Sequence, residues 1–369
     1  MLPHLVEPFS HILETLKMQI DMHFYGVYCL ARSAGINADT AHIIAMASQF
    51  VNDANLINSV LIDNNRCIRP LRTSFKKCPP HYSEEDSWRV WIPFHFLPGN
   101  EPADGIFNER IICRKNSLMA QKLVLFSLKD EHGDLWPYLI GITAHAYADT
   151  FSHYDFSGLS HQHNRIIPDS IQLDKNHQNL ITEYMASRSK NFMNQYLPDN
   201  NQQPVGHAQV AAYPDRPFLK WKYEKDVKKS GKVYRRDNTA DYMEACECLY
   251  YFFLEYIKKN ANVRDPKGPK EWKDIAPIVR FILGIEAPCD QRIPVWKRNL
   301  LSGVFGELTP VDQDLHYDRH QWQLNRARWE SEDSGEAIEK SHAYLFCKAA
   351  SIYQHYVLKH LLVENGLLG

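Results

Sequence analysis

The sequence predicts an all-α fold in which long loops connect the helices. Apolar residues recur at the helical spacing of three and four positions in seven separate segments. The stretches between these segments are rich in Pro, Asn and Gly, and no internal repeat is visible. We therefore expect a multi-helix core that supports long loops, and loops of that length in a compact domain usually carry function.

The N-terminal half is expected to contain four helices. The first spans residues 18–35 and ends at Gly35, because glycine accepts the left-handed conformation that closes a helix. The second spans 37–61 with Asn37 as its N-cap, and the third spans 116–130 with Asn116 as its N-cap. The fourth spans 134–156 and has Pro137 in its first turn, where proline is tolerated.

Three helices are expected in the C-terminal half, over residues 237–260, 275–284 and 335–366. Loops are expected over residues 57–107, 157–178, 197–237 and 286–335. Within these loops, we expect a short strand pair at 87–96 and a hairpin at 220–236 that turns at Ser230–Gly231.

Composition excludes several classes of protein. The net charge of −2 gives no strong field for nucleic acid or an anionic membrane. No stretch approaches 18 apolar residues, and the N-terminus carries Glu7 and Glu14 instead of a basic start and an apolar core. We expect a cytoplasmic protein, and export without a cleaved signal is also compatible with the sequence. The chain has no CxxC pair, which argues against a structural zinc knuckle.

The segment GITAHAYADTFSH places His145, Asp149 and His153 four residues apart on one helical stripe. Side chains at i and i+4 lie about 6 Å apart along the axis and can share a metal ion. His145 and His153 lie about 12 Å apart, too far to share one ion, so Asp149 is the natural bridge between two. Hydrogen-bonded core histidines or a helical ion pair would give the same pattern, and both interpretations stay open at this point.

Other metal-ligand residue types occur in separate segments. They are His23 with Asp21 nearby, Asp53 at the end of an apolar helix, His95 in an aromatic segment, and His207 with Asp215 on a loop. A helical scaffold that presents His and Asp from five segments is typical of a metal centre. Zinc is the leading ion for this ligand mixture, and manganese or iron also suits it.

The blocks QIDMHFYGVYCLARSAG, AMASQFVNDA, FHFLPG, GITAHAYADTFSHYDFSG and GHAQVAAYPDRPFLKW resemble those of an uncharacterised bacterial family. That family is itself similar to the zinc-dependent phospholipase C and single-strand nuclease superfamily. The HxxxDxxxH block also resembles the N-terminal domain of glycosylphosphatidylinositol-specific phospholipase D. The resemblance implies a phospholipase C/nuclease-like helical core with two or three zinc ions.

The resemblance also implies ligands. Asp53, His95, His145 and Asp149 would surround one zinc ion, and Asp149 would bridge to a second ion shared with His23. His153 and His207 would hold a third ion, with Asp215 as a carboxylate ligand, and Asp53 would also act as a catalytic base. The superfamily enzymes use a mature N-terminal Trp as a ligand, for which Asp21 is the substitute here. Position 211 is Ala, so His207 lacks the partner four residues on that the phospholipases have.

These observations predict a metal-dependent phosphoester hydrolase that acts on a small-molecule or lipid substrate. The alternative is a non-catalytic, metal-stabilised helical protein that binds a protein partner. An HD-type phosphohydrolase would need an adjacent His–Asp pair, which the chain lacks. We expect one domain over 1–369, with an extension at 1–17, a ligand-bearing core at 18–225 and a helical part at 226–369 packed on that core.

Overall fold

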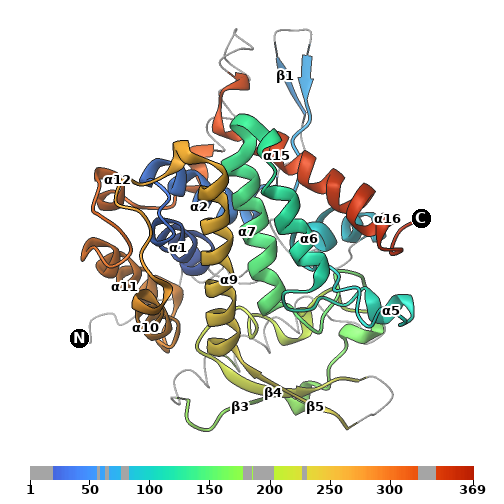
Figure 1. Cartoon of the computed structure of the whole chain (residues 1–369). Helices are drawn as coiled ribbons and strands as arrows, with labels where there is room; N and C mark the ends of the chain where they lie inside the picture. The colour runs from blue at the N-terminus through green and yellow to red at the C-terminus, as the bar shows by residue number, and fades with distance from the viewer. Residues whose placement is uncertain are drawn as a thin grey trace, which may run out of the picture.

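The computed structural model describes residues 20–55, 59–62, 66–75, 83–177, 185, 203–226, 231–322 and 338–369. This part of the chain is mostly helical, and it also contains a small three-stranded sheet and a two-stranded hairpin (Figure 1). The all-α prediction is therefore right for the core and misses the small sheet.

Helix α7 (Trp136–Ser152) lies at the centre of the fold (Figure 1), and it carries the predicted ligand stripe. Four helices pack against it, namely α2 (Ala38–Asp53), α6 (Leu118–Ser127), α9 (Asn238–Lys259) and α15 (His342–Tyr356). Gly141 allows the closest of these approaches, because a Cβ there would overlap the carbonyl oxygen of Ile44 on α2. The ligand-bearing helix is thus enclosed on several sides.

The N-terminal helical segment begins with a π-helical turn, η1 (Asp21–Gly26), and continues as α1 (Val27–Ser33). Gly35 follows with a φ of 85°, as expected for a helix-ending glycine. The side chain of Asn37 accepts a hydrogen bond from the backbone N–H of Thr40 at 2.9 Å, which confirms Asn37 as the N-cap of α2. Helix α2 ends at Asp53, well before the predicted residue 61, and a hairpin of β1 (Val60–Ile62) and β2 (Arg66–Ile68) follows it.

The predicted strand pair at 87–96 is wrong. This segment is helical, with α3 (Glu84–Asp86), a π-turn η2 (Ser87–Trp91) and α4 (Ile92–Phe94) in succession. Ser83 and Asp86 form a reciprocal capping box that starts the helix, and Pro93 lies in the first turn of α4. These local signals override the strand preference of the aromatic and branched side chains.

Helix α5 (Phe107–Arg110) precedes α6, whose N-cap is Ser117 and not the predicted Asn116. The Ser117 side chain accepts from the N–H of Ala120 at 3.3 Å, while Asn116 takes a left-handed φ of 44° just before the helix. The predicted cap was therefore one residue too early. The turn η3 (Asp130–Leu135) then leads into α7.

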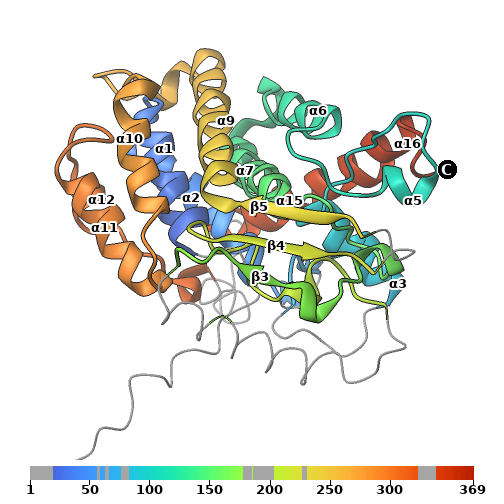
Figure 2. The same ribbon diagram turned by 90° about the horizontal axis from the view of Figure 1, so that it is seen from below.

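The small sheet has the order β3 (Gln172–Leu173), β4 (Lys220–Glu224), β5 (Val233–Asp237), with antiparallel pairing throughout. It lies below the helices, near the C-terminal end of α7 (Figures 1 and 2). The predicted hairpin at 220–236 is confirmed as β4 and β5, while Ser230 of its turn lies outside the described residues. Short 3₁₀ turns occupy Gln162–Asn164, Pro168–Ser170, Ala208–Val210 and Ala261–Val263.

The C-terminal part adds α10 (Trp272–Leu283), α11 (Cys289–Leu301) and α12 (Pro310–Gln313). Helices α11 and α12 lie in the predicted loop 286–335, so that prediction is wrong for those residues. The last predicted helix is present as α15, a π-turn η8 (Val357–Leu361) and α16 (Leu362–Glu364), and its residues 335–337 lie outside the described part. Gly366 ends it with a φ of 67°.

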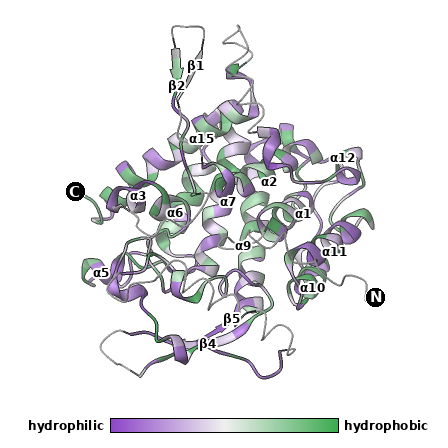
Figure 3. Ribbon diagram, turned by 180° about the vertical axis from the view of Figure 1, so that it is seen from behind, coloured by the Kyte–Doolittle hydropathy of each residue, from purple (hydrophilic) through white to green (hydrophobic). Residues whose placement is uncertain are grey.

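One apolar core contains residues from both ends of the described chain, from Met22 to Leu367. A second, smaller cluster includes Phe96 and Phe156 together with aromatic residues of β4. Apolar and polar residues alternate along the helices (Figure 3), and none of the helices described is both long and apolar enough to cross a membrane.

Candidate metal centre

Six buried side chains form two groups, each with two histidines and one aspartate. In each group, one nitrogen or oxygen from every member lies within 4.8 Å of the others. The first group consists of His23, His145 and Asp149, and the second of His153, His207 and Asp215. Within the described residues, these two groups have the composition and spacing to hold metal ions.

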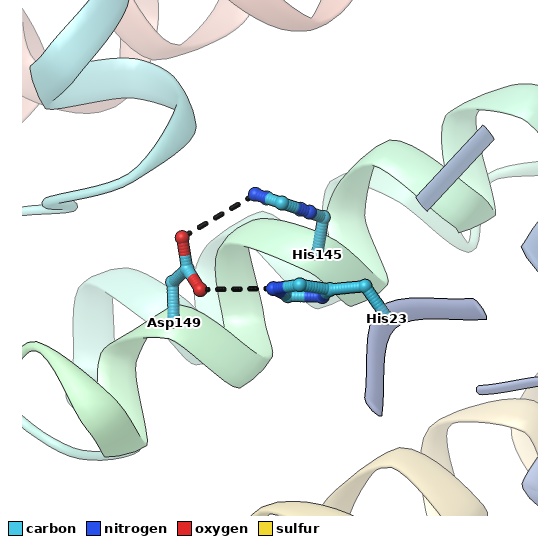
Figure 4. A group of neighbouring side chains, drawn as sticks. All are labelled: His23, His145 and Asp149. Atoms are coloured by element: carbon cyan, nitrogen blue, oxygen red, sulfur yellow. Dashed lines mark ion pairs between the residues drawn. The ribbon is translucent and has the colours of Figure 1, made fainter. Parts of the chain in front are cut away.

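Figure 4 shows the side chains of the first group. Asp149 directs its two carboxylate oxygens to different rings: Oδ1 lies 3.2 Å from His23 Nε2, and Oδ2 lies 3.3 Å from His145 Nε2. The rings of His23 and His145 are stacked with their centroids 3.9 Å apart. Two parallel imidazoles and one carboxylate thus converge from η1 and α7.

Several polar atoms of these groups are buried without a hydrogen-bond partner. They are both ring nitrogens of His23, Nδ1 of His145, Oδ1 of Asp149 and Oδ2 of Asp215; His23 Nε2 and Asp149 Oδ1 face each other at 3.2 Å but without the geometry of a hydrogen bond. Leaving such groups unpaired is costly, by about 1–3 kcal/mol each. A divalent cation would satisfy several of these atoms at once, so the residues present fit a metal ion.

The π-turn η1 places His23 in this group. Single π-turns are rare and occur frequently at functional sites. His23 lies within η1 and is fully buried. The 3.6-residue periodicity used to predict this helix from sequence carries no signal for such a turn.

The second group joins the first through the ring of His153. Its Nδ1 lies 3.5 Å from Oδ2 of Asp149, and its Nε2 lies 3.2 Å from Oδ1 of Asp215. His207 Nε2 lies 3.8 Å from the same oxygen of Asp215. A single imidazole therefore lies between the carboxylates of the two groups, which makes them neighbours.

Backbone carbonyls fix the orientation of three imidazoles. His95 Nε2 donates to the carbonyl of Thr73 at 2.9 Å, His153 Nδ1 to that of His95 at 2.8 Å, and His207 Nδ1 to that of Ala211 at 2.8 Å. A carbonyl only accepts, so each of these nitrogens carries a hydrogen and the other nitrogen faces the carboxylates. Metal-binding histidines are commonly held in this way.

The two groups have strongly perturbed pKa values. Burial, together with the neighbouring His23, lowers the pKa of His145 to about 3, and burial lowers the pKa of His207 to about 4. Burial acts in the same direction on His153, but the charge of Asp149 and the hydrogen bond to Asp215 outweigh it and raise the pKa of His153 to about 9. Burial would raise the pKa of Asp149, but the neighbouring histidines hold it well below its usual range.

His95 lies beside the first group. Its Nδ1 is 3.2 Å from Asp149 Oδ2 and 3.3 Å from His145 Nε2. The structure thus brings together seven of the nine predicted ligands: His23, His95, His145, Asp149, His153, His207 and Asp215.

Asp53 is not a member of either group. Its Oδ2 accepts hydrogen bonds from the Tyr317 hydroxyl at 2.7 Å and from Gln49 Nε2 at 3.2 Å. Tyr317 follows α12, in a segment that the sequence predicted as a loop, so this contact had no signal in the sequence.

Asp21, predicted to replace the N-terminal ligand, is not a member of either group. Its Oδ2 accepts a hydrogen bond from Arg292 Nε at 2.7 Å, and its Oδ1 accepts one from the thiol of Cys289 at 3.3 Å. A buried guanidinium requires a counter-charge, and Asp21 supplies it. The sequence did not reveal this pairing because Arg292 lies on the unpredicted helix α11.

The chain belongs to a family of unknown function. The profile of the family of unknown function DUF6765 matches residues 18–361, which is most of the chain. The expected membership of an uncharacterised family is thereby confirmed. No curated protein and no solved structure matches the chain.

Proposed function

We propose that the protein is a metal-dependent phosphoester hydrolase with one divalent ion, preferably zinc, in each of the two groups. The observation that carries this proposal is the position of His153 between Asp149 and Asp215, because it makes the two groups neighbours. Divalent ions in phosphatases and nucleases stabilise the charge that develops on a phosphoryl group and activate water.

The number of protein ligands also supports catalysis. Each group supplies three ligand residues, as catalytic zinc sites do, whereas structural zinc sites are closed by four. His95 lies close enough to the first group to be a fourth ligand there. The second group is therefore the better candidate for the ion with an open coordination position.

The substrate class comes from the resemblance of the sequence blocks to phospholipase C-like and single-strand nuclease enzymes. We propose a small-molecule or lipid phosphoester. In this proposal Asp149 is a ligand of the ion in the first group, and Asp53, held by Tyr317 and Gln49, lies outside both groups.

A non-catalytic, metal-stabilised protein that binds a partner is the second candidate, and one observation favours it. All six residues of the two groups are at most 7% exposed. Deep burial suits an ion that holds helices together and not one that meets substrate.

Two measurements separate these candidates. Metal content is measured on protein purified without added metal, and hydrolysis is measured with bis-p-nitrophenyl phosphate and a panel of natural phosphoesters. Two metal equivalents together with hydrolysis that chelation abolishes support the enzyme. Two equivalents with no hydrolysis in the whole panel support the structural role, and protein that binds no metal contradicts both.

A further inference from the structure

Arg236 lies on β5 and reaches the C-terminal end of α7, next to His153. Its Nη2 donates to the carbonyl of Ser152 at 2.5 Å, and its Nη1 donates to the carbonyl of Tyr154 at 3.3 Å. These two carbonyls flank His153 in the chain. The last carbonyls of a helix lack partners within the helix, so a fork of N–H donors is well suited to hold them.

The guanidinium is itself fixed from several sides. Arg236 is 3% exposed, and its Cζ lies 3.6 Å from the centroid of the Tyr154 ring. Its Nε lies 3.6 Å from Oδ2 of Asp241 on α9, and the Tyr154 hydroxyl donates to the same oxygen at 3.0 Å. Arginine, aromatic ring and carboxylate thus form a closed set of contacts around the segment 152–154.

His153 is the C-cap residue of α7 and is no longer held by a regular helix on its C-terminal side. Its ring nevertheless contacts the carboxylates of both groups. A shift of its backbone by a fraction of an ångström would move a ligand nitrogen by a similar amount. The backbone on both sides of this residue therefore needs an external support.

We propose that Arg236 is a positioning residue for the second group: by holding the carbonyls of Ser152 and Tyr154, it fixes His153 where it can bind a divalent ion with His207 and Asp215. This inference rests on the two-ion centre proposed above and adds a residue of β5 that supports one of its ligands. It assigns a function to strand β5 of the small sheet.

The test is a titration of the metal-free, full-length protein with Co²⁺, whose visible absorption reports the ligands of each equivalent. Arg236→Met removes both donors while keeping an apolar stem. Asp241 stays paired in this variant, because Lys115 also donates to it. Arg235→Met is the matched control, since Arg235 is the neighbouring residue on the same strand and is exposed.

We expect Arg236→Met to lower the affinity for the second Co²⁺ equivalent by about 10- to 100-fold, as is usual when the support of a metal ligand is removed. The affinity for the first equivalent should not change. Arg236→Lys should give a smaller loss with an altered Co²⁺ spectrum, because lysine keeps the charge but lacks the fork of donors. Arg235→Met should match the wild type. The unchanged first equivalent serves as the internal check that the core is folded.

Wild-type affinity for both equivalents in Arg236→Met would overturn the proposal. If Arg236→Met does not fold, Arg236→Lys decides, and wild-type affinity and spectrum in that variant would overturn it too. Wild-type protein that binds no Co²⁺ would overturn the metal centre along with this inference. Two bound ions without any hydrolysis would contradict only the proposed catalysis.

Discussion

His153 donates its Nδ1–H to the backbone carbonyl of His95 at 2.8 Å, so one candidate ligand orients another. His95 in turn donates to Thr73, which precedes α3 in the chain. His95 thus lies between the two groups, because its carbonyl holds His153 and its Nδ1 lies 3.3 Å from Nε2 of His145.

The first prediction concerns Asp149, whose two oxygens face His23 and His145 separately. Asp149→Asn keeps the size of the side chain but removes the charge that binds the ions. We expect the loss of at least one metal equivalent and of nearly all phosphodiesterase activity, with the far-UV circular dichroism retained. Metal analysis and hydrolysis of bis-p-nitrophenyl phosphate measure the two effects.

Asp155→Asn is the matched control. Asp155 follows the same helix, has a φ of 69° that Asn tolerates, and pairs with Arg114 outside both groups. It should retain the metal content of the wild type. Full metal content in both variants would show that Asp149 is not a ligand.

The second prediction concerns stability. A metal ion that binds only the folded protein at 100 times its dissociation constant stabilises it by about 2.7 kcal/mol. Chelation should therefore lower the melting temperature by several degrees, at roughly 2–4 °C per kcal/mol, and added zinc should restore it. Calorimetry with and without chelator checks this, and identical transitions would mean that the histidines are ordinary core residues.

The third prediction concerns the contact between α2 and α7. A Cβ at Gly141 would overlap the Ile44 carbonyl and lie 2.7 Å from the Cβ of Ala47. Gly141→Ala should therefore destabilise the protein by about 1–3 kcal/mol, despite the better helix propensity of alanine. In Gly284→Ala the nearest atom would be 3.3 Å away, and we expect little change. Denaturant unfolding of both variants checks the difference, and equal stability would contradict the close packing.

The fourth prediction concerns Lys225, which is buried beside His163 and donates to the carbonyl of Asp155. Burial lowers its pKa from 10.5 to about 7. Between these values the unfolded chain holds a proton that the folded protein lacks, so this lysine makes the free energy of unfolding fall as the pH falls from 10.5 to 7. Below pH 7 the effect is constant, at roughly 5 kcal/mol.

Lys225→Met should therefore gain stability relative to the wild type as the pH falls from 10 to 7. Lys222→Met, on the preceding strand β4, serves as the control and should follow the wild type in parallel. Urea unfolding at several pH values gives the difference directly. A pH-independent difference between Lys225→Met and the wild type would mean that the lysine stays charged in the folded protein.

Much of the helical core was predictable because amphipathic periodicity and caps such as Asn37 and Gly35 are local signals. Helix α11 was missed because Pro288 and Pro294 suggested a loop, although Pro288 precedes its first turn and Pro294 lies within its first two turns. The 87–96 segment was misassigned because its branched and aromatic residues favour strands, while the capping box that starts its helix lies upstream.

The ligand stripe on α7 was predictable because i and i+4 positions share one face of a helix. The ion pair of Asp21 with Arg292 was not, because it joins residues 271 positions apart and depends on tertiary packing. The contact of Tyr317 with Asp53 could not be predicted either, because these residues are also far apart in the sequence. The sequence thus indicated which residue types gather, but not which carboxylates are already neutralised by other partners.

The seven residues that converge come from four stretches of the chain, and the last of them, Asp215, lies almost 200 residues after the first, His23. During synthesis, His23, His95 and the stripe on α7 leave the ribosome well before His207 and Asp215 do. The first group can therefore assemble on a nascent chain, whereas the second must wait for the segment that leads into β4. An ion captured early would be held by the first group alone, so the order of translation favours loading of the first group before the second.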